Sequence, residues 1–163
     1  MSDLRIGIGT DRHRLEPHCP CILGGVTIEC PVGPDGHSDG DAVLHALCDA
    51  LLGAAGLEDL GTLFPDTDPK WEGQASSLFV TETLALLNQA HLWPTSVDMV
   101  VHCDQPKIGP YRDAIRKQIA NLLSLPLDRI NIKGKTTEGG DSTWIDVTAV
   151  ALVGTSSQTD SNC

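Results

Sequence analysis

The first residues whose types and spacing could support chemistry are Asp11-Arg12-His13. Residues two apart in an extended segment point to the same side, so Asp11 and His13 can converge on one ion while Arg12 points away. A carboxylate and an imidazole are common zinc ligands. The segment therefore predicts part of a metal site, although a solvated loop explains the same three residues.

A second group lies in a segment that is expected to form a helix. Asp41, His45 and Asp49 are spaced by four residues, which places them on one helix face. His45 can then ligate a metal while Asp41 or Asp49 orients its second ring nitrogen. Together, Asp11, His13 and His45 would leave the fourth tetrahedral position open, as in catalytic zinc sites. An ordinary capped helix with an acidic face is the alternative.

Three further polar segments are candidates for a functional site. Residues 63–68 read Leu-Phe-Pro-Asp-Thr-Asp, a pattern also typical of a Pro-initiated turn. Residues 104–107 follow a strand, and strand ends are where α/β proteins tend to bind ligands. Residues 133–140 combine lysines, hydroxyls and glycines, which suit a phosphate, and Glu138 is a hard oxygen ligand suited to Mg²⁺. A solvated strand end followed by a turn explains the last segment equally well.

Alternating strands and helices must position these residues. Period-2 alternation predicts strands, and apolar residues at helical spacing predict helices. We expect one helix to begin at its N-cap Ser38 and to end at Gly56. The other expectations are strands over 4–8, 97–103, 130–133 and 147–153, a hairpin over 21–28, loops over 31–36 and 57–70, and helices over 76–91 and from Pro110 onward.

The length and charge restrict the class of protein. The 163 residues suit one α/β domain over 1–154, followed by a polar tail over 155–163 that we expect to be disordered. The formal net charge of -11 argues against nucleic-acid and anionic-membrane partners. It does not exclude a small phosphorylated ligand, because metal, Lys and Arg can reverse the field inside one cleft. With no apolar run long enough to span a bilayer and no signal-peptide pattern, we expect a cytoplasmic protein.

The six cysteines are then expected to be mostly reduced thiols. Cys19-Pro20-Cys21 with Cys30 could also form a zinc knuckle, although structural zinc sites usually have wider pairs. Both interpretations fit the sequence.

Five motifs occur in order along the chain. They are Asp-Arg-His at 11–13, Ile-Leu-Gly-Gly-Val at 22–26, His-Ser-Asp-Gly-Asp through to His at 37–45, Leu-Gly-Ala-Ala-Gly at 52–56 and Leu-Phe-Pro-Asp-Thr-Asp at 63–68. In content, order and spacing this set resembles the 2-C-methyl-D-erythritol 2,4-cyclodiphosphate synthase family. The resemblance runs from about Arg5 to Val153.

The resemblance implies a fold and a set of cofactors. The fold would be an α/β two-layer sandwich of a mixed four-stranded sheet with helices on one face plus a small hairpin. It would assemble as a homotrimer with active sites shared between neighbouring subunits. Zinc would be bound by Asp11, His13 and His45, and Mg²⁺ or Mn²⁺ by Glu138.

The resemblance also implies roles toward a substrate that carries a cytidine diphosphate. His37 and Thr136 would act in catalysis, Asp59 and 64–68 would line the methylerythritol part, and 103–109 would hold the cytidine. The substrate-binding residues would be Ser38, Asp59, Gly61, Phe64, Asp66, Asp68, Cys103, Asp104, Gln105, Pro106, Lys107, Ile108, Gly109, Lys135, Thr137 and Glu138.

The implied reaction is an intramolecular phosphoryl transfer that cyclises 4-diphosphocytidyl-2-C-methyl-D-erythritol 2-phosphate and releases CMP. The segment after Glu138 departs from the family pattern, because it is shorter, lacks an Arg and carries Trp144. A degenerate zinc-binding trimer with little turnover is therefore an alternative. A metal-dependent hydrolase that releases an uncyclised product is another.

Overall fold

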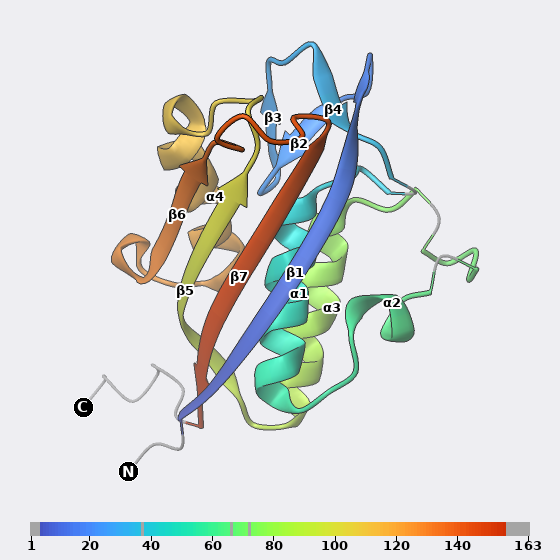
Figure 1. Ribbon diagram of the computed structural model, residues 1–163. Coiled ribbons are helices and arrows are strands. Elements are labelled where there is room, and N and C mark those ends of the chain that lie inside the picture. The colour runs from blue at the N-terminus through green and yellow to red at the C-terminus, as the bar shows by residue number, and fades with distance from the viewer. Residues whose placement is uncertain (1–3, 37, 66, 72, 156–163) are drawn as a thin grey trace.

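The computed structural model describes residues 4–36, 38–65, 67–71 and 73–155. Figure 1 shows the arrangement of its strands and helices. The strands are β1 (Leu4–Pro17), β2 (Cys21–Leu23), β3 (Val26–Ile28), β4 (Val32–Pro34), β5 (Trp93–His102), β6 (Ile130–Lys135) and β7 (Trp144–Gly154). The helices are α1 (Ala42–Ala55), α2 (Leu60–Leu63), α3 (Ser76–Gln89) and α4 (Arg112–Leu123), with 3₁₀ turns at Gly109–Tyr111 and Leu127–Arg129.

The main sheet is mixed and contains five strands in the order β4-β1-β7-β5-β6. β5 and β6 run parallel, and the other neighbouring strands are antiparallel. The prediction of four strands was therefore wrong. The additional strand is β4, which lies in the segment expected to be a loop. Gly33 and Pro34 concealed it, because both residue types are depleted in strands.

The N-terminal strands form one bent hairpin. Leu15 pairs with Pro34, and Cys21 pairs with Ile28 in the same register. The chain reverses at Gly24-Gly25, where both residues have positive φ values of 61° and 75°, as a type I′ turn requires. The hairpin predicted over 21–28 is confirmed and is the tip of this longer structure.

The large helices cover one face of the sheet. In Figure 1, α1, α3 and α4 all lie behind it. The side chains of β7 alternate between buried and half-buried, as expected for a sheet with one covered face. On the opposite face of β1, Leu4, Ile6 and Ile8 are 56%, 71% and 68% exposed. The apolar core therefore lies between the sheet and the helices.

Helix α1 lies unusually close to β1. A Cβ atom added to Gly7 would lie 2.0 Å from the carbonyl oxygen of Ala50, and one added to Gly9 would lie 2.1 Å from that of Ala46. Such distances are far shorter than van der Waals contact. The absence of side chains at these two positions therefore allows the backbone of the helix to approach the strand that carries Asp11 and His13.

Helix α1 begins at an N-cap that the sequence assigned to the wrong residue. The cap is Asp41 rather than Ser38, and its Oδ1 accepts hydrogen bonds from the amides of Val43 and Leu44 at 3.1 Å each. The same buried carboxylate accepts the amides of Gly24 at 2.8 Å and Gly25 at 2.6 Å. Burial raises the pKa of Asp41 to about 6 despite these donors. One side chain thus joins the start of the helix to the hairpin turn.

Most of the remaining elements follow the predictions with shifted ends, whereas the short helix α2 lies in the segment over 57–70 that was expected to be a loop. Helix α1 ends at Gly56 as expected, and α3 begins at residue 76. Pro110 lies in a 3₁₀ turn, and the third large helix begins only at Arg112. Strands β1, β5, β6 and β7 are all longer than predicted, because pairing in the sheet extends them through residues of weak β-propensity.

Helix α4 protects the edge of the sheet at β6. Arg112 Nε donates to the carbonyl of Ile132 at 3.0 Å, and Arg116 Nε donates to that of Ile130 at 2.8 Å. Strand β6 is the last in the order, so these carbonyls have no further strand to pair with. The two guanidinium groups satisfy them instead.

None of the described helices combines the length and the apolar character needed to cross a bilayer. The division into a domain over 1–154 and a disordered tail over 155–163 stays a prediction, since residues 156–163 lie outside the described ones.

The contact between β1 and α1 gives a first testable prediction. Gly9→Ala should lower the free energy of unfolding by about 3 kcal/mol, because the new methyl group meets helix backbone that cannot move aside. Gly53→Ala is the matched control, since its nearest neighbour would lie 3.7 Å from the new Cβ. Replacing this helical glycine should leave stability unchanged or raise it by about 1 kcal/mol. Urea unfolding measures both; equal midpoints for Gly9→Ala and the wild type would contradict the prediction.

Candidate active site

The predicted metal ligands line a cleft of about 610 Å³ between β1, α1 and α3. Asp11 and His13 point into it from β1, and His45 from the first turn of α1. Gly61 and Phe64, which were predicted to bind substrate, line the same cleft. The structure therefore brings together the metal-ligating group and part of the predicted substrate surface.

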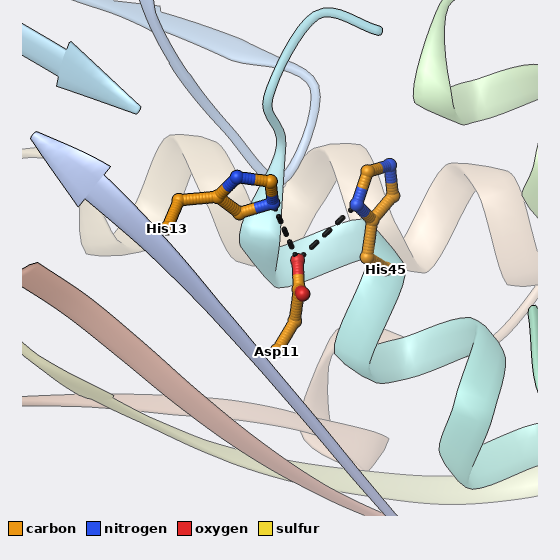
Figure 2. A group of neighbouring side chains, drawn as sticks. All are labelled: Asp11, His13 and His45. Carbon is orange, nitrogen blue, oxygen red and sulfur yellow. Dashed lines mark hydrogen bonds and ion pairs between the residues drawn. The ribbon is translucent and has the colours of Figure 1, made fainter. Parts of the chain in front are cut away.

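Asp11 lies at the centre of the group. Its Oδ2 is 2.9 Å from His13 Nε2 and 3.2 Å from His45 Nδ1 (Figure 2). One atom from each of the three side chains lies within 4.8 Å of the others, and this is the only such group of three found among the described residues. The spacing of strand and helix residues thus predicted a real convergence.

The second nitrogen of each imidazole has its own partner. His13 Nδ1 lies 2.7 Å from the carbonyl oxygen of Asp35. His45 Nε2 lies 2.9 Å from Ser76 Oγ and 3.3 Å from Ser38 Oγ. These contacts leave His13 Nε2 and His45 Nδ1 directed at the same carboxylate oxygen.

The residues expected to orient His45 are engaged elsewhere. Asp41 caps α1 and holds the hairpin, and Asp49 Oδ1 accepts the amide of Leu60 at 2.7 Å. The shortest contact of His45 Nε2 is instead with Ser76 Oγ, although the sequence context of Ser76 indicated only the start of a helix. No spacing rule connects it to His45 across 31 residues; a Ser at the start of α3 was the only available signal.

The charges of the group favour a cation. Burial raises the pKa of Asp11, but hydrogen bonds from His13 and His45 outweigh it and hold this pKa well below its usual range. The hydrogen bond to Asp11 raises the pKa of His13. Asp11 thus offers an ionised carboxylate oxygen between two imidazole nitrogens, and all three are groups that ligate divalent cations. The donor set therefore fits a divalent metal with an open coordination position.

Aromatic side chains form another wall of the cleft. The ring centroids of Phe64 and Trp71 are 5.0 Å apart, and those of Phe64 and Phe79 are 5.6 Å apart. Trp71 and Phe79 were not predicted to belong to the site, because their spacing also suits ordinary core packing. Together the three rings give this part of the cleft an apolar surface.

The neighbouring acidic residues have structural partners as well. Asp59 Oδ1 caps α2 by accepting the amide of Thr62 at 2.8 Å, and Asp68 Oδ1 accepts the amide of Lys70 at 3.0 Å. His37 and Asp66 lie outside the described residues, so their predicted roles stay predictions.

The predicted cytidine and diphosphate segments form a separate group at the ends of β5 and β6. Asp104 accepts hydrogen bonds from the amide of Thr137 at 3.0 Å and from its hydroxyl at 2.7 Å. These bonds lower the pKa of Asp104. The hydroxyl of Thr136 donates to Glu138, and both residues are exposed. Asp104 therefore fastens one predicted segment to the other.

The other members of this group differ in exposure. Cys103, Pro106 and Ile108 are buried, and Cys103 Sγ donates to the carbonyl of Pro106 at 3.4 Å. The exposed members are Gln105, Lys107, Gly109 and Lys135.

Within one chain, the two groups do not share a cavity. Asp104 and Gln105 line a second cleft of about 480 Å³ together with Arg14 and Thr143, whereas none of 103–109 or 135–138 lines the cleft at Asp11. The single chain thus supplies both halves of the predicted site in different places.

Two features left open by the sequence are now defined. Trp144 packs under the guanidinium of Arg12, whose Cζ lies 4.6 Å from the ring centroid, and Arg12 also pairs with Asp146 at 3.2 Å. The described cysteines, Cys19, Cys21, Cys30, Cys48 and Cys103, are free thiols. The zinc-knuckle interpretation gains no support.

The fold and the cleft define an α/β protein with an Asp-His-His group that could hold a metal ion in a cleft large enough for a small ligand. The YgbB family model matches residues 4–154. A relative from Thermus thermophilus, named 2-C-methyl-D-erythritol 2,4-cyclodiphosphate synthase, is 48% identical over 150 residues, covering 92% of this chain and 99% of the relative. A chloroplastic relative of the same name from Arabidopsis thaliana is 46% identical over 85% of this chain and 60% of the relative. The chain belongs to the YgbB family, the family of the 2-C-methyl-D-erythritol 2,4-cyclodiphosphate synthases.

Solved structures agree with this assignment. A synthase of that name in its CDP-bound form superposes with a TM-score of 0.88 at 46% identity, covering 91% of this chain and 99% of the other. A CDP complex from Plasmodium falciparum gives a TM-score of 0.81 at 32% identity, covering 94% and 97%. The similarity therefore includes relatives in which a cytidine diphosphate is bound.

The geometry at Asp11 predicts metal binding that depends on His45. The wild type should bind one zinc ion per chain. His45→Ala should weaken zinc binding by about 100-fold or more. Loss of a residue that only hydrogen-bonds to a metal ligand costs about 10–100-fold, and loss of the ligand itself should cost at least as much. His102→Ala, on the exposed part of β5, is the control and should bind as the wild type does. Chelator competition measures the affinities, and stoichiometric zinc in His45→Ala would show that this ligand is misassigned.

Proposed function

We propose that the chain converts 4-diphosphocytidyl-2-C-methyl-D-erythritol 2-phosphate into 2-C-methyl-D-erythritol 2,4-cyclodiphosphate and releases CMP. In class it is then a cyclising phosphorus–oxygen lyase. The observation that carries this proposal is the Asp11-His13-His45 centre inside a cleft, in a chain 48% identical to a synthase of that name over nearly its full length. Free thiols in the described part agree with a reducing, cytoplasmic location.

The reaction needs no nucleophile from the protein. An oxygen of the substrate's 2-phosphate forms a bond to the β-phosphorus, and the bond between that phosphorus and the bridging oxygen breaks, so CMP leaves with the electron pair. The protein has to bring two anionic groups together and offset their charge. Zinc held by Asp11, His13 and His45, and Mg²⁺ or Mn²⁺ held by Glu138, would supply that charge neutralisation.

Other side chains of the cleft suit the binding of a phosphate and the exclusion of water. Ser38 lies beside His45 and offers a hydroxyl to a phosphate, and the preceding residue in the sequence, His37, is proposed to contact the phosphate through its imidazole. The aromatic wall of Phe64, Trp71 and Phe79 would keep water from part of the cleft once substrate is bound, which would favour ring closure over hydrolysis.

The polar residues are assigned to the two ends of the substrate. Asp59, Gly61, Asp66 and Asp68 are proposed to contact the methylerythritol part. The segment 103–109 is proposed to hold the cytidine. Thr136 would polarise the diphosphate, with Lys135 and Thr137 beside it.

We further propose a homotrimer in which neighbouring subunits share each active site. Two observations support it. The centre at Asp11 and the segments at Asp104 line different clefts of one chain, and a second copy that brings its Asp104 segment to the Asp11 cleft would complete the site. The face of β1 that the helices leave uncovered exposes Leu4, Ile6 and Ile8, an apolar surface suited to contact with another subunit.

The assembly can be tested by mass. The wild type should sediment at three times the 17.3 kDa of one chain. The double variant Ile6→Lys with Ile8→Lys should sediment as a monomer, because burying two ammonium groups in an apolar interface is costly. Leu57→Lys, which changes an exposed Leu in the loop after α1, should remain a trimer. A monomeric wild type contradicts the proposal.

The reaction can be tested by its products. With zinc and Mg²⁺ present, the protein should release one CMP per substrate and give the cyclic diphosphate signal in ³¹P NMR. Thr136→Val should lower kcat by about 10²–10³, the usual effect of removing one donor to a developing charge. Thr81→Val, on the exposed part of α3, serves as its control.

The remaining outcomes separate the alternatives. An uncyclised phosphate product would identify a hydrolase. Absence of CMP release would identify a degenerate trimer that binds ligand without turnover, as the shortened segment after Glu138 first suggested.

A further inference from the structure

The first turn of α3 makes an unassigned contact with the metal centre. Ser76 is completely buried, and its hydroxyl lies between Asp39 and His45. It donates to Asp39 Oδ1, and its oxygen is 2.9 Å from His45 Nε2. Asp39 Oδ2 also accepts the amide of Ser76 at 3.0 Å. Two bonds therefore fix the position of this hydroxyl.

The number of hydrogens on each group determines which group donates in the hydrogen bonds of Ser76 with Asp39 and His45. An ionised carboxylate only accepts, so the single hydroxyl hydrogen of Ser76 points to Asp39. The oxygen of Ser76 can then only accept from His45, which requires a hydrogen on Nε2. In a neutral imidazole, that hydrogen leaves the lone pair on Nδ1. Nδ1 is the atom that faces Asp11 Oδ2 at 3.2 Å.

The same helix also restrains the imidazole ring. Phe79 follows Ser76 by three residues and contacts His45 edge to face, with centroids 6.1 Å apart and planes inclined at 67°. Residues three apart lie on one side of a helix, so the first turn of α3 contacts both the nitrogen and the ring. Rotation about the His45 side chain is thereby limited.

Asp39 is held in place by further hydrogen bonds. The N-cap of α3 is Ala75, whose side chain cannot accept a hydrogen bond from the start of the helix. The carboxylate of Asp39 accepts the amide of Ser76, the first residue of α3, instead. Asp39 also accepts the amide of Asp41 at 3.2 Å. The loop before α1 and the start of α3 are thus joined at the point where the carboxylate meets Ser76.

We propose that Asp39 and Ser76 are positioning residues that keep the hydrogen of His45 on Nε2 and direct the Nδ1 lone pair to the metal. The inference rests on the metal centre of the proposed function and assigns the ligand atom of His45. Without Ser76, the remaining acceptor is Ser38 Oγ, which is more distant at 3.3 Å.

Zinc affinity without substrate is the first test. Ser76→Ala should weaken zinc binding by about 10–100-fold, as the loss of a partner to a metal-bound histidine does. Asp39→Asn, which keeps an acceptor oxygen in place, should weaken it less. Ser77→Ala is the matched control on the same helical turn and should bind zinc as the wild type does. Zinc affinity within twofold of the wild type in Ser76→Ala would overturn the proposal.

Nitrogen-15 NMR of the histidine side chains is the second test, and it does not require the variants to fold. In the zinc-loaded wild type, Nε2 of His45 should carry a hydrogen that exchanges slowly with water, and Nδ1 should show the shift of a metal ligand. A hydrogen on Nδ1 with zinc on Nε2 would refute the assignment. Neither test involves turnover, so failure to form the cyclic product would affect the proposed function and leave this inference standing.

Discussion

The close contact between the backbones of β1 and α1 is the constraint on which the proposed metal centre depends. Gly7 and Gly9 let the helix approach so closely that an added Cβ would overlap the carbonyls of Ala50 and Ala46. At this separation, His45 on the first turn of α1 reaches the carboxylate on the adjoining strand. A wider spacing would separate the ligands. The distance between the ligands of the site is thus set by Gly7 and Gly9, the two positions of β1 that carry no side chain.

Hydrogen bonds around the centre convert that proximity into defined geometry. The carboxylates near the start of α1 have separate roles, since Asp41 holds the helix and the hairpin turn while Asp39 holds the start of α3. The carbonyl of Asp35 hydrogen-bonds to Nδ1 of His13, and the hydroxyl of Ser76 hydrogen-bonds to Nε2 of His45. Because the outer nitrogen of each imidazole has a hydrogen-bond partner, the two rings have little freedom to turn away from an ion.

The sequence predicted the parts of the site that local periodicity controls. Asp11 and His13 share a side because a strand has period two, and His45 lies on a predictable helix face. Spacing assigned the wrong role to Asp41, because the N-cap position turns that side chain back onto backbone amides. It could not find Ser76, which reaches His45 only through the packing of two helices. Contacts between distant segments depend on tertiary structure, which spacing does not encode.

The guanidinium groups on the β6 edge have a consequence for how copies of the chain can associate. Free carbonyls along an outer strand act as a template for another strand, which is the route to open-ended sheet growth. Here Arg112 and Arg116 occupy those acceptors. Lateral extension of the sheet at β6 is therefore disfavoured, whereas the apolar face of β1 that the helices leave uncovered suits the proposed contact between copies. Association through a face allows a closed ring of fixed size, whereas association through this edge would have no natural end.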